Sequence, residues 1–368
     1  MKMNAAVLHD VNIPLIVEEI DLADPKPGEV RVKIEAVGLC QADIHYMKGV
    51  MGCPTPIVLG HEGAGIVDAV GEGVWTVKPG DHVLMGVLVP CGKCPECVAG
   101  KPYQCEVSPE RRRQGGQLSD GTSRLSKDGK SIACAFAQGS FAEYVVVWEL
   151  SVAKIDEKAP FDKICSLGCG VGTGLGAAFN NPKLKIEFGD SVAVFGCGTV
   201  GMSVIMGAKL AHARKIIAVD ILDDKLAVAR ELGATMTVNA KKEDPIERIV
   251  LDTGGVDYAF ECVGIPALVN QAYDVAKAVG GTVVVCGAMA MGQTVTFDGF
   301  PFLLGKSVVG VGAGFMKSGY DLPRYVDLYM RGELPMDKLV THHFKLEDIN
   351  QAVEVLEKGE CIKAVIHP

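Results

Sequence analysis

The stretch Val192-Ala193-Val194-Phe195-Gly196-Cys197-Gly198-Thr199-Val200-Gly201 decides how the second half of the chain folds. A short β-rich run precedes three glycines at the Gly-x-Gly-x-x-Gly spacing, and a helical pattern follows them. Glycines at this spacing permit a tight turn and let the backbone approach a pyrophosphate at a helix N-terminus. Asp220 ends the next strand-like run, where a carboxylate accepts a hydrogen bond from the adenosine ribose and repels a 2′-phosphate. The pattern therefore predicts NAD rather than NADP.

The residues after this stretch continue the alternation of strand and helix patterns. Helical patterns separate four buried-strand patterns, at Val192–Phe195, Ile216–Asp220, Tyr258–Glu261 and Thr282–Cys286. This alternation predicts an α/β domain with a doubly wound parallel sheet. A glycine-rich packing turn is the alternative interpretation of the motif. The predicted cofactor-binding residues here are Gly196, Gly198, Thr199, Val200, Gly201, Asp220 and Lys225.

The first half of the chain has a different pattern. Up to about residue 150, short apolar alternations are broken by Gly and Pro, which indicates a β-rich, barrel-like domain. After about residue 315 the chain predicts two helices and a closing strand, which we expect to return to the first domain. The predicted boundaries are 1–170 with 316–368 for the first domain and 171–315 for the second.

Four cysteines lie close together in the sequence, at Cys91, Cys94, Cys97 and Cys105. Short turns with Gly and Pro bring such sulfurs to one side, which predicts a closed tetrahedral zinc site in a lobe of about residues 90–106. The alternatives are a redox Cys-x-x-Cys pair or a disulfide cluster, but a redox pair needs no third and fourth sulfur. A closed site has no position for substrate, so this zinc is expected to be structural.

Three more soft ligands, Cys40, His61 and Cys169, each stand beside glycine. Two thiolates and one imidazole leave a fourth tetrahedral position open, as a catalytic zinc requires. From the residues alone, core packing of these side chains is an open alternative.

Composition excludes several function classes. The formal net charge is −9 and the pI about 5.5, so binding to nucleic acid or to an anionic membrane is not expected. The 13 cysteines form an odd number, and no signal peptide pattern precedes them, which favours reduced thiols in the cytoplasm. The long apolar run at 192–211 contains Gly196, Gly198 and Gly201 and belongs to the nucleotide motif rather than to a membrane span.

Five motifs occur in order and carry a family resemblance. They are Gly60-His61-Glu62-Gly63-Ala64-Gly65, the four-cysteine lobe, Asp120-Gly121-Thr122-Ser123-Arg124, Ser166-Leu167-Gly168-Cys169-Gly170 and the glycine motif at 196–201. Together they resemble the zinc-dependent alcohol dehydrogenases of the medium-chain dehydrogenase/reductase superfamily, nearest to the class I and class III branch. The resemblance implies a GroES-like catalytic domain, a Rossmann domain with a cleft between them, two zinc ions per chain, NAD, and a homodimer formed through Rossmann-sheet edges.

The resemblance also implies site roles. Cys40, His61 and Cys169 correspond to the catalytic zinc ligands. The other matched residues are Glu62 as a nearby carboxylate, Asp43 as the residue that orients the histidine, Thr173 at the nicotinamide, Lys363 near the pyrophosphate and His45 at the surface end of a proton relay. The implied reaction is hydride transfer between a small-molecule alcohol and NAD⁺, giving an aldehyde or ketone.

Two positions bear on the substrate. Ala42 stands where the family carries a Ser or Thr that begins the proton relay. This departure motivates one alternative, a reductase of C=N or C=C bonds on the same scaffold. Arg111, Arg112 and Arg113 form either a solvated basic loop or a site for an anionic or bulky substrate. A second alternative, from another class, is a non-catalytic NAD(H)-binding structural protein.

Overall fold

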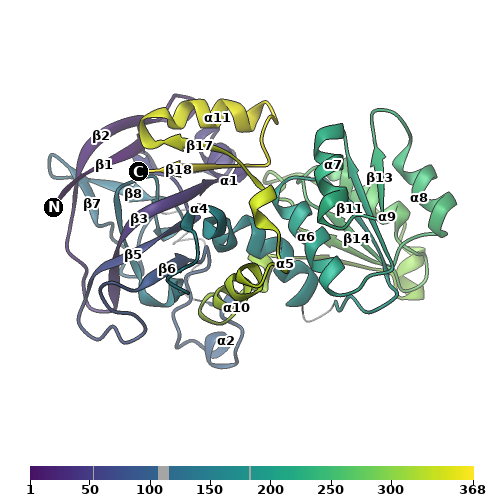
Figure 1. The fold of residues 1–368 in the computed structure, drawn as a ribbon, viewed down its shortest axis with the longest axis horizontal. Helices are drawn as coiled ribbons and strands as arrows, with labels where there is room; N and C mark the ends of the chain where they lie inside the picture. The colour runs from purple at the N-terminus through teal and green to yellow at the C-terminus, as the bar shows by residue number, and fades with distance from the viewer. Residues whose placement is uncertain (53, 107–115, 182–183) are drawn as a thin grey trace. The chain divides into compact units, whose positions relative to one another are not determined.

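The chain divides into two compact units in the computed structural model, which describes residues 1–52, 54–106, 116–181 and 184–368. The first unit contains Met1–Cys169 and Met316–Pro368, and the second contains Gly170–Phe315. In Figure 1 the yellow C-terminal elements of the first unit lie among its purple N-terminal strands. The tail therefore returns to the first unit.

Two sheets build the first unit. One is a closed barrel of five short strands, in the order β1 (Lys2–Leu8), β2 (Ile16–Leu22), β7 (Leu125–Lys127), β8 (Lys130–Cys134) and β4 (Ile57–Val58). The other has seven strands, of which six run in the order β10 (Val152–Lys154), β6 (His82–Met85), β5 (Gly63–Val70), β3 (Glu29–Leu39), β18 (Lys363–His367) and β17 (Val340–Lys345). The seventh, β9 (Tyr144–Trp148), also pairs with β3. The last strand of the chain thus lies inside a sheet, between β3 and β17.

Short helices connect these strands. The α-helices are α1 (Gln41–Met47), α2 (Pro95–Val98), α4 (Phe161–Ile164), α10 (Ser318–Met330) and α11 (Ile349–Glu357). The 3₁₀ turns are η1 (Pro102–Gln104), η2 (Ala135–Ala137), η3 (Glu149–Ser151), η4 (Cys165–Gly168), η7 (Met336–Lys338) and η8 (Leu346–Asp348). Of these elements, α1, α2, η1 and η4 carry or adjoin the predicted site residues.

The second unit is a parallel sheet with helices. Its six strands run in the order β13 (Met236–Asn239), β12 (Lys215–Asp220), β11 (Ser191–Phe195), β14 (Tyr258–Glu261), β15 (Thr282–Val285) and β16 (Ser307–Gly310). Every neighbouring pair is parallel. Strand order reverses between β11 and β14, and open α/β sheets bind ligands beyond the carboxyl ends of strands at such a point.

The helices of this unit follow the strands. They are α5 (Gly170–Phe179), α6 (Thr199–Leu210), α7 (Asp223–Leu232), α8 (Pro245–Thr253) and α9 (Pro266–Val275), with the turns η5 (Phe300–Leu304) and η6 (Ala313–Phe315). Buried aliphatic and aromatic side chains such as Phe195, Val219, Val238 and Val283 fill one core against the sheet. The predicted doubly wound fold is confirmed, while β13, α8, β16 and β17 are elements that sequence patterns did not predict.

Candidate functional site

The four-cysteine lobe brings its sulfurs together around α2. Cys91 Sγ lies 4.0 Å from Cys97 Sγ, and Cys94 Sγ lies 3.9 Å from Cys105 Sγ. A tetrahedron with zinc–sulfur bonds of about 2.3 Å has edges of about 3.8 Å, so these separations fit zinc and exclude disulfide bonds. Backbone N–H groups of Cys91 and Cys94 also point at sulfurs, each at 3.3 Å. The lobe thus stabilises negatively charged sulfurs, as a zinc ion requires.

A second group of donors comes from segments far apart in the sequence. Cys40 directly precedes α1, His61 lies between β4 and β5, and Cys169 follows η4. The donor atoms of Cys40, His61, Glu62 and Cys169 all lie within 4.8 Å of one another. Of the residues that the structure describes, only these four and the four-cysteine lobe form such metal-binding groups.

Asp43 fixes the geometry of this second cluster through hydrogen bonds. Its fully buried carboxylate accepts hydrogen bonds from the backbone N–H groups of Cys40 and Gly60, both at 3.0 Å, and contacts His61 Nδ1 at 3.1 Å. Because Asp43 accepts the Nδ1 proton, Nε2 of His61 is the nitrogen available for a metal. That Nε2 is buried and has no hydrogen-bond partner among the described residues.

The electrostatics of the cluster favour a positive charge at its centre. Contact with the Cys169 sulfur lowers the pKa of Cys40 well below its usual value, with His61 helping and burial opposing. Burial alone would lower the pKa of His61, but Asp43 and Cys40 outweigh it and raise that pKa well above its usual value. A thiolate, an imidazole with a bare buried nitrogen and a second thiol form a donor set that fits zinc.

Glu62 and Lys363 form a buried ion pair beside the cluster. Lys363 Nζ donates to Glu62 Oε2 at 2.7 Å and to the Leu39 carbonyl at 3.0 Å, and both side chains are at most 2% exposed. Burial raises the pKa of Glu62 despite the neighbouring ammonium. At Gly38 a Cβ atom would lie 2.1 Å from Glu62 Oε2, so only glycine leaves room for this carboxylate. The resemblance placed Lys363 near the cofactor pyrophosphate, and its contact with Glu62 was not predicted.

Phe136 is another contact that the sequence did not predict. Its ring centroid lies 4.2 Å from that of His61 and 5.4 Å from that of Tyr46. Phe136 has a φ of 55°, a left-handed conformation that is rare for an aromatic residue. The Phe136 ring therefore packs on the face of the His61 imidazole, while Asp43 contacts Nδ1 at the edge of that imidazole.

The relay residues are placed as follows. His45 lies half-buried on α1. Burial lowers the pKa of His45, and the smaller opposing effect of the Cys40 sulfur does not restore it. Ala42, on the same helix, offers no hydroxyl. Thr173 is buried on α5 and belongs to the second unit, so its role at the nicotinamide stays a prediction. Arg111, Arg112 and Arg113 lie outside the described residues.

The dinucleotide loop has the geometry that its glycines predict. Gly196 has a φ of 94°, and a Cβ atom on Gly201 would lie 1.8 Å from the Gly196 carbonyl oxygen. No atom lies within 4 Å of a Cβ placed on Gly198, so that backbone is open to a ligand. Thr199 and Val200 open α6, whose N-terminus carries a partial positive charge suited to a phosphate.

Asp220 stands at the carboxyl end of β12 beside this loop. One carboxylate oxygen accepts from the Cys197 N–H at 2.7 Å, and the other accepts from the N–H groups of Ile221 and Leu222. Lys225 is half-buried on α7, close to the same loop. Burial raises the pKa of Cys197, and the Lys225 ammonium opposes that rise only weakly. The carboxylate is thus anchored to the glycine loop.

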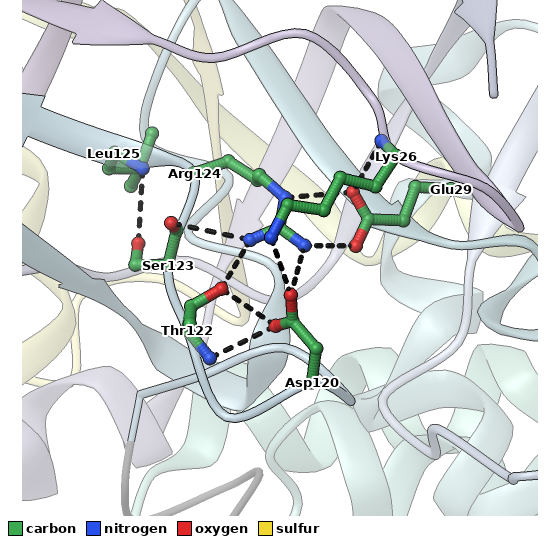
Figure 2. A network of polar contacts seen from close by, with 7 residues as sticks. All are labelled: Lys26, Glu29, Asp120, Thr122, Ser123, Arg124 and Leu125. Atoms are coloured by element: carbon green, nitrogen blue, oxygen red, sulfur yellow. Dashed lines mark hydrogen bonds and ion pairs between the residues drawn. The ribbon is translucent and has the colours of Figure 1, made fainter.

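The Asp120–Arg124 motif forms a polar network within the first unit (Figure 2). The Arg124 guanidinium, whose side chain is 4% exposed, donates to both oxygens of Glu29 and to Asp120. Lys26 and Thr122 also donate to Asp120. Burial alone would raise the pKa of Asp120, but these hydrogen bonds outweigh it and lower that pKa. The motif therefore ties residues 120–124 to the start of β3 rather than to the metal cluster.

Comparisons with known proteins find matches in both units. The family model described as "Alcohol dehydrogenase GroES-like domain" matches residues 26–157, and "Zinc-binding dehydrogenase" matches residues 199–330. The chain is 42% identical to alcohol dehydrogenase class-3 of Zea mays, covering 98% of this chain and 96% of that protein. It is also 42% identical to S-(hydroxymethyl)glutathione dehydrogenase of Synechocystis sp., covering 100% of both.

Solved structures give the same result. An alcohol dehydrogenase zinc-binding domain protein from Burkholderia ambifaria superimposes with a TM-score of 0.94 at 37% identity, covering 100% of this chain and 99% of that one. Benzyl alcohol dehydrogenase from Acinetobacter calcoaceticus gives 0.94 at 35% identity, with the same coverage. In the part of the chain that the structure describes, no helix is long and apolar enough to cross a membrane.

These similarities span the whole chain and favour hydride transfer between an alcohol and NAD over the two alternatives. The chain belongs to the zinc-binding, NAD-dependent alcohol dehydrogenases of the medium-chain dehydrogenase/reductase superfamily.

Proposed function

We propose that Cys40, His61 and Cys169 hold the catalytic zinc of this alcohol dehydrogenase. The observation that carries the proposal is the buried, unpartnered Nε2 of His61 within 4.8 Å of donor atoms from both cysteines. When bound, zinc supplies a Lewis acid that polarises the alcohol or carbonyl oxygen, and NAD⁺ supplies the hydride acceptor. In this proposal Met1–Cys169 with Met316–Pro368 is the catalytic domain and Gly170–Phe315 the Rossmann domain.

The protein's own residues prepare the site in three ways. Asp43 keeps the proton on His61 Nδ1 and fixes the ring, which is how carboxylates support metal-bound histidines. The Glu62–Lys363 ion pair adds no net charge beside the donors, so two thiolates and one dication sum to zero. A neutral site polarises an oxygen without holding a developing negative charge too strongly for release.

Proton release needs a different route from that of most relatives. Ala42 cannot pass a proton, so His45 must receive it through water or another hydroxyl. A lowered pKa keeps His45 largely neutral at pH 7, in the form that can accept a proton.

The test of the catalytic site is zinc content together with activity. Wild-type protein should contain two zinc ions per chain and oxidise primary alcohols with NAD⁺. Cys40→Ser should lower the zinc content to one and abolish the reaction while NADH binding persists. Turnover of enones or iminium ions without any alcohol would instead favour the reductase alternative, and full zinc retention in Cys40→Ser would contradict the ligand assignment.

We propose that Cys91, Cys94, Cys97 and Cys105 hold the structural zinc, because their sulfurs meet at tetrahedral separations and no fifth donor among the described residues joins them. A closed tetrahedral set leaves no coordination position for substrate. Removing this zinc should therefore unfold the lobe without changing the chemistry of the other site.

The substrate class that we propose is a primary alcohol carried on an anionic thiol adduct. Two observations support it: the 42% identity to S-(hydroxymethyl)glutathione dehydrogenase, and Arg111, which matches by resemblance an arginine that contacts such substrates. The kcat/KM of S-(hydroxymethyl)glutathione should exceed that of benzyl alcohol at least tenfold. Arg111→Ala should reduce only the former, whereas a preference for benzyl alcohol would contradict the proposal.

We also propose NAD(H) in preference to NADP(H), with Asp220 as the discriminating residue. The carboxylate is held in place by three backbone N–H groups at the end of β12, where a 2′-phosphate would meet a fixed negative charge. Equal use of NAD⁺ and NADP⁺ by the wild type would contradict this assignment.

We propose a homodimer that joins two copies through β16. Among the described strands, β16 ends the sheet order and pairs only with β15. The neighbouring η5 exposes Phe300 by 65% and Leu303 by 81%, an apolar surface that a second copy would cover. Sedimentation equilibrium should show a dimer that Leu303→Glu dissociates and that Leu251→Glu, on exposed α8, leaves intact. A monomeric wild type at micromolar concentration would contradict the proposal.

The compartment that we propose is the cytoplasm, because thiols that bind zinc stay reduced there. Fractionation of the source cells with an antibody to the chain tests this placement.

A further inference from the structure

Two cysteines outside both metal clusters stand next to each other at the carboxyl edge of the second unit's sheet. Cys262 directly follows β14 and Cys286 directly follows β15. The last registered pair of these parallel strands is Glu261 with Val285, so Cys262 and Cys286 are the next pair. The Cys286 N–H still donates to the Glu261 carbonyl at 2.8 Å, which holds the two segments in register beyond the strands.

The geometry suits a covalent link. Adjacent strands lie about 4.8 Å apart, within the 4.4–6.8 Å that separates the Cα atoms of a disulfide. The Cys286 sulfur lies close enough to Cys262 to raise the pKa of the Cys262 thiol, together with burial. Both residues are free thiols and only half-buried, so a small reagent can reach them.

Their position couples them to the dinucleotide loop. Strand order reverses between β11 and β14, and the Cys262 N–H donates to the carbonyl of Phe195, the residue before Gly196, at 2.9 Å. A Cβ atom on Gly196 would lie 2.3 Å from Val263 Cγ2. The segment that begins at Cys262 therefore packs directly against the first glycine of the loop.

We propose that Cys262 and Cys286 form a reversible disulfide, and that this modification weakens NAD(H) binding. The oxidant class is a low-molecular-weight disulfide such as glutathione disulfide. The effect on NAD(H) rests on the assignment of the glycine loop as the dinucleotide site, whereas formation of the link does not.

The exchange balances as two successive thiol–disulfide steps. Contact with Cys286, together with burial, raises the pKa of Cys262, so the first attack comes from Cys286 on one sulfur of the oxidant. This step forms a mixed disulfide on Cys286 and releases one small thiolate. Cys262 then loses its proton to solvent and attacks the Cys286 sulfur, releasing the second small thiolate. Two protein thiols give up two electrons and two protons, and one small disulfide becomes two small thiols.

Closure of the link constrains the backbone next to the loop. A disulfide brings its sulfurs to about 2.05 Å, closer than any hydrogen-bonded pair of thiols. The segments that follow the two cysteines are already in close contact, because a Cβ atom on Gly287 would lie 2.0 Å from the Gly264 nitrogen. An adjustment that draws the two sulfurs together is therefore transmitted through Val263 to Gly196. We expect the Kd of NADH to rise about tenfold, within the usual range of coupling between two sites.

The experiment uses the zinc-loaded full chain. The protein is incubated with glutathione disulfide, alkylated, digested and mapped by mass spectrometry, with zinc content measured in parallel. NADH affinity is titrated by fluorescence before and after oxidation and again after dithiothreitol. We expect a peptide link between Cys262 and Cys286, retained zinc, and a tenfold weaker affinity that dithiothreitol reverses. By linkage, saturating NADH stabilises the reduced pair and should raise its reduction potential by about 30 mV for the same tenfold factor.

Control variants separate the outcomes. Cys262→Ser and Cys286→Ser should each lose the response, and Cys286→Ala provides a second substitution if one serine variant folds poorly. Cys134→Ala removes a buried thiol of the first unit and should keep the response. Absence of the link, or a linked protein with unchanged NADH affinity, would overturn the inference. If the reduced protein bound no NADH, the dinucleotide assignment would fail, and with it the proposed effect on affinity, even where the link formed.

Discussion

The substitution Asp43→Asn tests the support of the catalytic metal cluster most directly. The Asp43 carboxylate accepts three N–H donors, from Cys40 and Gly60 at 3.0 Å and from His61 at 3.1 Å. Asparagine has the same shape but only one acceptor oxygen. If that oxygen serves Gly60 and His61, the amide nitrogen faces the Cys40 N–H, and two donors oppose each other in a fully buried place.

The expected magnitude follows from that count. A hydrogen bond to a charged acceptor contributes about 1.5–3 kcal/mol, and one such bond is lost. Because 1.36 kcal/mol is a factor of ten, a loss of about 2 kcal/mol weakens zinc binding roughly 30-fold. This value agrees with the 10- to 100-fold loss that is typical when a carboxylate behind a metal-bound histidine is removed.

The assay is competition for zinc between the protein and a chromophoric chelator. The four-cysteine site serves as an internal reference, because Asp43 does not contact it. The matched control is Asp81→Asn, which changes another buried carboxylate of the same unit that accepts from Lys78 and Lys154. Zinc affinity in Asp43→Asn within a factor of two of the wild type, or an equal loss in Asp81→Asn, would refute the reasoning.

Four other changes have defined outcomes. Cys97→Ser should lower the zinc content, measured by mass spectrometry, from two ions per chain to one. Alcohol oxidation at the Cys40 site should persist in the folded fraction, and loss of both ions at once would contradict two independent sites. Asp220→Ala should narrow the kcat/KM preference for NAD⁺ over NADP⁺ by about 100-fold, because a fixed charge near a phosphate is worth several kcal/mol; an unchanged ratio would assign the discrimination elsewhere. Arg124→Met leaves Glu29 buried and unpaired, so the free energy of unfolding in urea should fall by about 3–5 kcal/mol, and a change below 1 kcal/mol would contradict this. The hydrogen bonds that lower the pKa of Asp120 stabilise the fold above the pKa of an unfolded Asp, about 3.9, and that contribution is lost as pH falls below it. Asp120→Asn should therefore be less stable than the wild type at pH 7 and should approach it in acid; a constant difference would refute the assignment.

The sequence predicted the parts of the molecule that depend on short spacing. The glycine motif and the four-cysteine lobe each occupy a few consecutive residues, so local geometry alone decides them. The cluster of Cys40, His61 and Cys169 spans more than a hundred residues, and its residues alone left core packing open. The resemblance, rather than any periodicity, joined those three positions.

Other contacts could not be predicted because they arise from tertiary pairing. Glu62 meets Lys363 only because β18 pairs with β3, 301 positions along the chain from the glutamate. The one signal was a lysine at the head of an apolar strand, which marks a charge with a buried partner. The left-handed backbone of Phe136 contradicts the ordinary preference of an aromatic residue, so no sequence rule would place its ring on His61.

Short edge strands were missed for a simpler reason. β13 and β16 have four residues each, half of them polar or glycine, and so they lack the continuous apolar run of the central strands. Helix α8 did carry a signal, since Asp244 caps it and Pro245 opens it, and a systematic search for N-caps would have found it.

The position of β18 between β3 and β17 has a consequence for biosynthesis. Residues 363–367 are translated after the whole second unit, yet the seven-stranded sheet of the first unit cannot be completed without them. The continuous unit Gly170–Phe315 is free to fold while the chain is still being translated. The N-terminal strands must wait as an incomplete nascent sheet until β18 has been translated, and this order exposes them to chaperones while the second unit folds.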